Sequence, residues 1–283
     1  MYSIALPDLD DDEMFARCIE YRRELEVKDV LDRLAPSVRN AYHCYTTYRG
    51  DPMNLSPRSW EREDRKALQS NYSLAPGSPF ARYRRDLIAR FIEKRCPMCG
   101  RGDVGTIDHY LPRSKFPEYS VLSANLIPVC GQCNLLKSSH FSTEAGRRFV
   151  HAYYDILPSH PVLIAHVRLN ERLDLSFAIV EPPGLPADLL RVLQFHFNQL
   201  DLAVLFEKEG IRELTERYGE IEEAFERGPR DLAEYLGAAA RSARKKCGVH
   251  SWKTAMFAAL EHHEAFCAGG FELLLKGEDR QDS

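Results

Sequence analysis

Apolar residues recur at helical spacing through the first third of the chain. Between residues 11 and 34 they form an approximate stripe, which predicts a helix with one face in the core. Pro36 is expected to end this helix, because proline lacks a backbone N–H and clashes with the preceding turn. A second helix is predicted over 38–48. The Pro- and Gly-containing stretch 75–79 then predicts a loop, followed by a helix over 80–94.

The pattern changes to strand-like runs after residue 160. Residues 162–167 and 173–180 predict two strands that pair as a hairpin, and the Pro-Pro-Gly run at 182–184 ends the pair. From residue 187 onward the apolar spacing is helical again. The expected helices cover residues 189–204, 211–226, 231–246 and 251–267.

These patterns predict a mixed α+β protein with three regions. A helical N-terminal region would cover 1–79, a central region 80–157, and a β-hairpin followed by helices 158–283. The C-terminal helices carry no recognisable catalytic motif, so they are expected to be a scaffold or a partner-binding surface. The chain has no phosphate-binding glycine loop of the GxxxxGK type, which argues against an ATPase.

Composition is that of an ordinary globular protein, with 44% hydrophobic and 28% charged residues. No run approaches the roughly 18 apolar residues that a membrane helix needs, so no membrane association is expected. The acidic N-terminus does not have the pattern of a secretory signal, and we expect a cytoplasmic protein. In that compartment, the eight cysteines favour metal binding over a disulfide framework.

Charge is distributed unevenly, although the net charge is only −4. Residues 80–150 contain 12 Lys and Arg against 6 Asp and Glu, whereas the rest of the chain contains 26 against 36. A basic segment of this kind favours phosphate backbones and therefore nucleic acid. The alternative is an ordinary solvated helix face.

Two CxxC pairs, Cys96 with Cys99 and Cys130 with Cys133, lie within this basic segment. Each pair fits one edge of a tetrahedron, so the four thiolates predict a closed, structural zinc site. A redox-active pair is the alternative for each CxxC alone, but two pairs bracketing one motif make it improbable. The remaining cysteines are interpreted as small buried hydrophobic residues: Cys18, Cys44, Cys247 and Cys267.

Four residues between and just after the cysteine pairs are suited to phosphodiester hydrolysis. His109 can act as a general base, because imidazole titrates near neutral pH, and Asn125 could fix its orientation. Asp108 would point to the opposite side of a strand from His109 and could face a metal ion. Asn134 could supply a carboxamide oxygen to the same ion. Oxygen ligands of this kind suit Mg²⁺ or another hard divalent ion.

The segment that holds Asp108-His109, Asn125 and Cys130-Gly131-Gln132-Cys133-Asn134 resembles the HNH endonuclease family, which has a ββα-metal fold. The resemblance covers residues 96–140 and implies a nuclease that uses Mg²⁺ or Mn²⁺. It implies that His109 is the general base, that Asp108 is a metal ligand, and that Asn125 orients the base and holds the loop between the strands. Asn134 stands at the family's last position, which makes this chain an HNN variant.

The runs at 108–112 and 151–155 are also similar to standalone bacterial HNH proteins linked to anti-phage defence. That narrower resemblance implies a role against phage or foreign DNA and a partner ATPase encoded alongside. An HNH unit cuts one strand, so cleavage of both strands would need two events or two copies, and a homo-oligomer is one expectation. Three basic residues are predicted to contact phosphate: Arg113, Lys115 and Lys137.

Three functions are therefore open from the sequence. The leading hypothesis is a metal-dependent endonuclease that cuts or nicks DNA. The second is a zinc-stabilised module that binds nucleic acid without catalysis. The third is a nuclease with the same site that acts on RNA.

Overall fold

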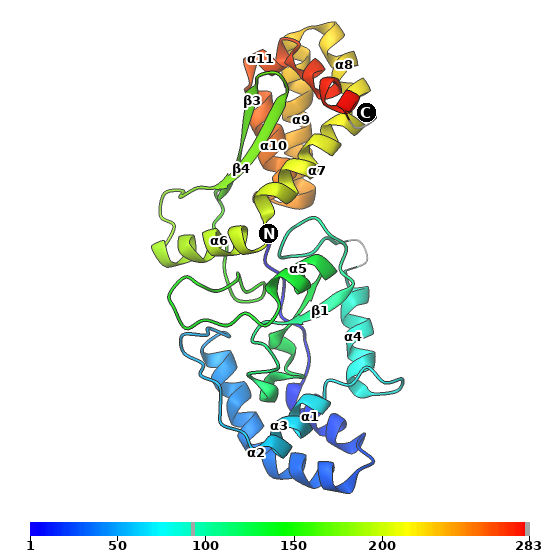
Figure 1. Ribbon diagram of the computed structural model, residues 1–283, viewed down its shortest axis with the longest axis vertical. Helices are drawn as coiled ribbons and strands as arrows, with labels where there is room; N and C mark the ends of the chain where they lie inside the picture. The colour runs from blue at the N-terminus through cyan, green and yellow to red at the C-terminus, as the bar shows by residue number, and fades with distance from the viewer. Residues whose placement is uncertain (92–93, 281–283) are drawn as a thin grey trace. The chain divides into compact units, whose positions relative to one another are not determined.

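The structure, a computed structural model, describes residues 1–91 and 94–280, with side chains described up to residue 275. These residues divide into two compact units, one made of 3–156 and the other of 1–2 together with 157 onward. Both contain helices and each contains one two-stranded sheet (Figure 1). The predicted α+β class is confirmed.

The N-terminal helices differ from the prediction in where the chain breaks. Helix α1 covers Asp11–Glu20 and helix α2 covers Leu25–Thr47, so Pro36 lies inside α2 and the expectation that it ends a helix is wrong. One proline removes one intrahelical hydrogen bond. That loss is offset here because α2 buries residues on both sides of the proline, among them Leu34 and Val38.

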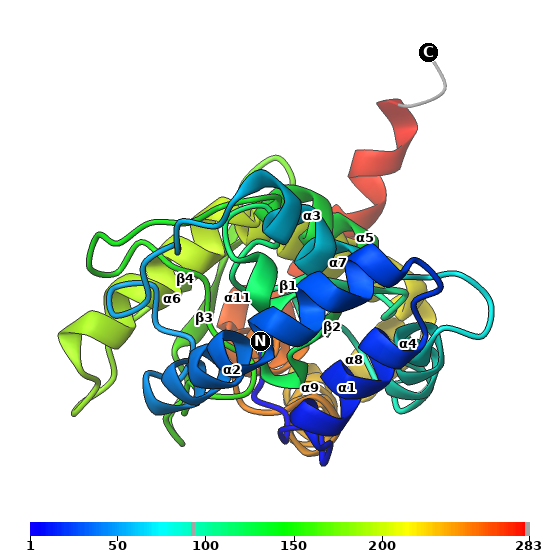
Figure 2. The same cartoon turned by 90° about the horizontal axis from the view of Figure 1, so that it is seen from below.

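The helices of the first unit pack against one another around this buried face. Helix α1 contacts α2 and α4, and α2 contacts α3 (Figure 2). Helix α3 covers Arg62–Ser70 and α4 covers Pro79–Ala89. Ser78 caps α4 by accepting a hydrogen bond from the Ala81 N–H, and Pro79 occupies the first turn, where proline is tolerated. Helix α4 is shorter than predicted, and residues 92 and 93 of the prediction lie outside the described residues.

A small ββα unit follows α4. Strand β1 (Thr106–His109) pairs antiparallel with β2 (Leu126–Val129), and helix α5 (Gly131–Lys137) comes directly after β2. Two 3₁₀ turns, η1 (Pro117–Tyr119) and η2 (Ser123–Asn125), lie in the connection between the strands. This arrangement confirms the predicted ββα unit at the centre of the chain.

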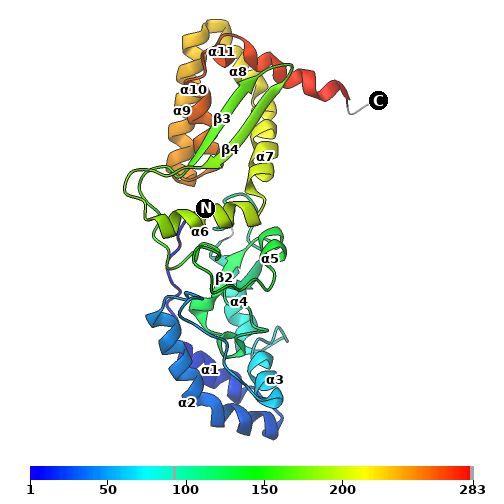
Figure 3. The same cartoon turned by 60° about the vertical axis from the view of Figure 1, so that its left-hand side comes forward.

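The second unit is built on the predicted hairpin. Strands β3 (Leu163–Leu169) and β4 (Leu173–Ile179) pair antiparallel from Leu163 opposite Ile179 to Leu169 opposite Leu173. Helix α10 packs on β3 and α7 packs on β4 (Figure 3). Gly210 permits the close approach of α7, because a Cβ there would lie 2.3 Å from the Leu175 side chain.

The helices of the second unit are more numerous than predicted, because three of the expected helices, 189–204, 211–226 and 251–267, are divided at turns. Asp201, with a φ of 50°, separates α6 from α7. The elements are α6 (Ala187–Gln199), α7 (Leu202–Glu216), α8 (Tyr218–Arg227), α9 (Pro229–Cys247), α10 (Trp252–Glu261), α11 (Glu264–Cys267) and the 3₁₀ helix η3 (Gly270–Arg280). Among the described residues, none of the helices has the length and apolar character that a bilayer crossing requires.

Candidate active site and metal centre

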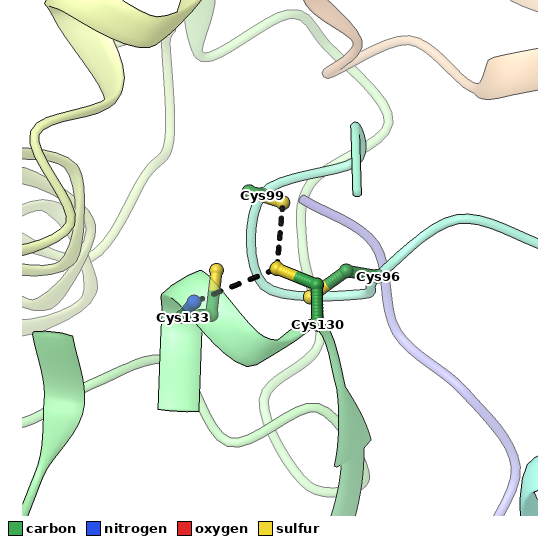
Figure 4. Close-up of side chains that lie close together, drawn as sticks. All are labelled: Cys96, Cys99, Cys130 and Cys133. Carbon is green, nitrogen blue, oxygen red and sulfur yellow. Dashed lines mark hydrogen bonds between the residues drawn. The ribbon is translucent and has the colours of Figure 1, made fainter. Parts of the chain in front are cut away.

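Four cysteines converge at the base of the ββα unit (Figure 4). The first pair lies in a tight turn in which the Cys96 N–H donates to the Gly102 carbonyl at 2.7 Å. The Cys99 sulfur accepts hydrogen bonds from the backbone N–H groups of Arg101 (3.5 Å) and Gly102 (3.4 Å). Cys130 caps α5 and accepts from the Cys133 N–H at 3.5 Å. Each pair is therefore held by its own backbone before any ion is bound.

This cluster fits a zinc ion. All four sulfurs are buried and lie within 4.8 Å of one another, and those of Cys99 and Cys130 are 3.9 Å apart. A tetrahedral site with Zn–S bonds of about 2.3 Å has sulfur–sulfur edges of about 3.8 Å. Hydrogen bonds among the four thiols lower the pKa of Cys99 and Cys130, which favours the thiolate that zinc requires, and raise the pKa of Cys96 and Cys133. Cys96, Cys99, Cys130 and Cys133 would hold Zn²⁺ with no open position, which is a structural site.

The antiparallel pair of strands places the predicted catalytic residues. Asp108 lies opposite Ile127 and His109 lies opposite Leu126. Because successive side chains of a strand point to opposite faces, the carboxylate and the imidazole leave β1 on different sides. Asp108 is buried, and His109 is half-buried.

Asp108 is paired with a lysine of α5. The Lys137 ammonium lies 2.9 Å from Asp108 Oδ2 and also donates to the His109 carbonyl at 2.8 Å. Lys137 is only 2% exposed, so in this conformation its ammonium contacts Asp108 instead of the phosphate expected from the sequence. Burial raises the pKa of Asp108, and Lys137 opposes that shift. Asn134 is half-buried one turn before Lys137, on the same side of α5.

The His109 imidazole is held by a backbone carbonyl. Its Nε2 lies 2.9 Å from the Ser120 oxygen, which can only accept, so Nε2 carries the proton and Nδ1 carries the lone pair. Burial lowers the pKa of His109 to about 3. The ring is therefore neutral near pH 7, which is the form that a general base needs.

Asn125 holds the loop between the strands. The side chain is fully buried, and its Oδ1 accepts from the Leu111 N–H (2.7 Å) and from the Tyr45 hydroxyl (3.0 Å). Its amide nitrogen donates to the carbonyls of Leu111 (3.1 Å) and Tyr119 (3.2 Å). Among the described residues no hydrogen bond joins Asn125 to the His109 ring. The loop-holding role expected for Asn125 matches this geometry, whereas Ser120 is what contacts the imidazole.

The two other predicted phosphate contacts are accessible. Lys115 is exposed, with its ammonium 5.4 Å from the centre of the Phe141 ring. Arg113 is half-buried, with its guanidinium carbon 4.9 Å from the centre of the Tyr72 ring. Both cations remain available to an anionic ligand.

Sequence reasoning missed Tyr72, a neighbour of His109, and Arg84, which acts on Tyr72. The Tyr72 ring, in the loop after α3, has its centre 4.6 Å from that of the His109 imidazole and also lies under Arg113. Arg84 of α4 donates to the Gly105 carbonyl at 3.1 Å, and burial raises the pKa of Tyr72 while Arg84 and Arg113 oppose that rise. Both residues lie outside the cysteine-bounded segment, Tyr72 in a loop and Arg84 on a helix, and no local pattern marks them. The N-terminal region thus contributes directly, through Tyr72, to the surroundings of the imidazole.

A second buried histidine connects α2 to the ββα unit. His151 Nδ1 accepts from the Tyr153 N–H at 3.3 Å, and Nε2 lies 3.0 Å from the Tyr45 hydroxyl. That hydroxyl in turn donates to Asn125, which completes a chain from His151 to the loop between the strands. Burial lowers the pKa of His151 to about 3, so this histidine is a neutral structural group.

Comparison with known proteins agrees with this geometry. Residues 96–140 match the family model of the HNH endonucleases. Over 233 residues the chain is 25% identical to Protein ea31 of Escherichia phage lambda, and the alignment covers 76% of this chain and 78% of that protein. No solved structure matches. The matched family segment contains β1, β2, α5 and both cysteine pairs. The chain therefore carries an HNH endonuclease domain at residues 96–140.

Proposed function

We propose that this protein is a divalent-metal-dependent endonuclease that hydrolyses phosphodiester bonds of DNA. The observation that carries the proposal is His109, a neutral imidazole fixed through Nε2 to Ser120 so that Nδ1 keeps its lone pair. Nδ1 takes the proton from the attacking water. Arg113 and Lys115 hold the phosphate backbone beside it.

Asp108 and Asn134 would hold Mg²⁺ or Mn²⁺ through oxygen atoms. Such an ion supplies charge stabilisation to the leaving oxygen and to the phosphate. Because Asp108 and Lys137 are buried together, the Asp108 carboxylate can bind an ion only if the ion displaces the Lys137 ammonium or binds the carboxylate beside it. The displaced ammonium would then be a second cation beside the reacting phosphate.

Cleavage of supercoiled plasmid tests this proposal. The zinc-loaded protein is incubated with Mg²⁺, with Mn²⁺ or with no added divalent ion, beside the variants His109→Ala and His43→Ala. His43 is an exposed histidine of α2 in the same unit and serves as the matched control. Metal-dependent nicking that falls by at least about 100-fold in His109→Ala alone supports the proposal. Nicking that is equal in both variants refutes His109 as the base.

A zinc-stabilised nucleic-acid-binding module without catalysis is the second candidate. The buried Asp108–Lys137 pair favours it, because that pair already neutralises the carboxylate expected to bind metal. A folded, zinc-loaded protein that binds nucleic acid but cuts neither DNA nor RNA with either ion would support this candidate. Duplex DNA, single-stranded DNA and RNA compared in the same assay decide the substrate.

We also propose the biological setting that the sequence resemblance implies, which is action against phage or foreign DNA together with a partner ATPase. The support is the resemblance of the runs at 108–112 and 151–155 to bacterial defence proteins. Plating of phage on cells that carry the chain with its neighbouring genes, with and without His109→Ala, tests it. Equal plaque numbers in both strains would refute it.

A further inference from the structure

The second unit carries a basic surface that the proposed active site does not use. Residues 235–260 contain five Lys and Arg and no Asp or Glu, whereas the other residues of 157–283 contain 10 against 21. Four of the five cations lie on the C-terminal half of α9, and all four are exposed. We name them the α9 basic surface: Arg241, Arg244, Lys245 and Lys246. A positive surface thus stands on an otherwise acidic unit.

Internal ion pairs do not account for this surface. Among the described residues no carboxylate lies within 4.0 Å of the cations of Arg244, Lys245 or Lys246. Other arginines of the same unit do form ion pairs: Arg172, Arg191, Arg212, Arg217, Arg227 and Arg230. The helix dipole favours cations in the last turn of α9. It does not explain Arg241, which precedes that turn.

A pocket of about 340 Å³ lies beside this surface, between α7, α9 and α10. Three cations and one carboxylate are in its lining: Arg217, Lys246, Lys253 and Glu213. The carboxylate pairs with Lys253 and, at 2.8 Å, with Arg217. Ser242 adds a hydroxyl next to Lys246. The pocket therefore extends the positive surface inward and offers donors to an anionic group.

We propose that the α9 basic surface and this pocket bind the phosphate backbone of nucleic acid, independently of base sequence. Closely spaced exposed cations neutralise phosphates and release counterions, which requires no base contact. A protein partner would need an apolar centre in its interface. None of the large apolar side chains exposed in the described chain lies between residues 205 and 274. The choice of nucleic acid as the polyanion rests on the proposed function.

Binding of a fluorescent DNA duplex to the full chain tests the proposal. A His109→Ala background without added divalent ion prevents cleavage and leaves the structural zinc in place. The test variant is Arg244→Glu with Lys245→Glu. Its matched control is Lys208→Glu with Arg230→Glu, the same charge change at exposed residues of the same unit. Arg241 is left unchanged, because its guanidinium and the Glu261 carboxylate both lie close to Gly237.

The expected result is a loss of affinity of at least about 10-fold in the test variant, with the control within about 2-fold of the parent chain. The slope of log affinity against log salt should fall by about 2, because each lost phosphate contact removes about 0.9. Superimposable thermal melts show that both variants are folded.

Equal affinity in the test and control variants would overturn the proposal and would favour an acidic protein as the partner of this surface. A parent chain that binds no nucleic acid would overturn it as well. The outcome is separate from that of the nicking assay. A chain that never nicks DNA, but that loses binding only in the test variant, supports this inference and refutes the endonuclease.

Discussion

The buried pair of Asp108 and Lys137 makes the sharpest prediction about the candidate site. The two side chains are 5% and 1% exposed, and the ammonium lies 2.9 Å from the carboxylate. Lys137→Met leaves a buried carboxylate without a partner, which should destabilise the first unit by about 3–5 kcal/mol. With a urea m-value of about 2 kcal/mol/M, the unfolding midpoint would fall by about 2 M.

The reverse change and the double variant complete a cycle. Asp108→Leu leaves a buried ammonium and should cost a similar amount, whereas Asp108→Leu with Lys137→Met replaces the pair by apolar groups and should cost less than either change alone. Trp60 and Trp252 lie in different units, so fluorescence of Trp60 in a Trp252→Phe background reports on the first unit. Additive losses in the double variant would refute the coupling and leave Asp108 independent of Lys137.

Three further predictions concern the metal centre and the buried histidine. Gly102→Ala should weaken zinc binding by about 10-fold or more in a chelator competition, because its Cβ would lie 2.7 Å from that of Cys130, whereas Gly105→Ala meets open space and should not. Cys96→Ser should abolish zinc binding, measured by elemental analysis. Without zinc, the first unit should no longer unfold cooperatively. His151, whose pKa is lowered to about 3, is neutral in the folded state while the unfolded chain takes up a proton near pH 6.5. Its contribution to stability should therefore fall by about 2 kcal/mol between pH 7 and pH 5, and His151→Gln should remove that part of the pH dependence measured by urea unfolding.

The parts of the site that could be predicted from the sequence are those that depend on short spacing. The backbone of a CxxC pair places its two sulfurs along one edge of a tetrahedron. The four cysteines could therefore be predicted as ligands without knowledge of the fold. Asp108 and His109 are adjacent on a strand, and their opposite directions follow from strand geometry alone.

The parts that could not be predicted depend on contacts between distant segments. No local sequence pattern distinguishes Lys137 from an exposed lysine such as Lys115. Lys137 is buried only because α5 packs on β1. Tyr72 reaches His109 from a loop 37 residues earlier in the chain. Pro36 failed as a helix end because tertiary burial on both sides of it outweighed the loss of one hydrogen bond.

The pairing of Asp108 with Lys137 also bears on how the site could bind a metal ion. A buried carboxylate that is neutralised by an ammonium keeps its position on the strand and does not attract other cations. A divalent ion must interact with the carboxylate more favourably than that ammonium does. An ion accompanied by substrate phosphate meets this condition, because the released lysine gains an anionic partner. Metal and nucleic acid would then bind with positive coupling, each raising the affinity for the other by the same factor. Mn²⁺ titrations with and without an uncleavable DNA analogue measure that factor, and an affinity for Mn²⁺ that is unchanged by DNA would exclude the exchange.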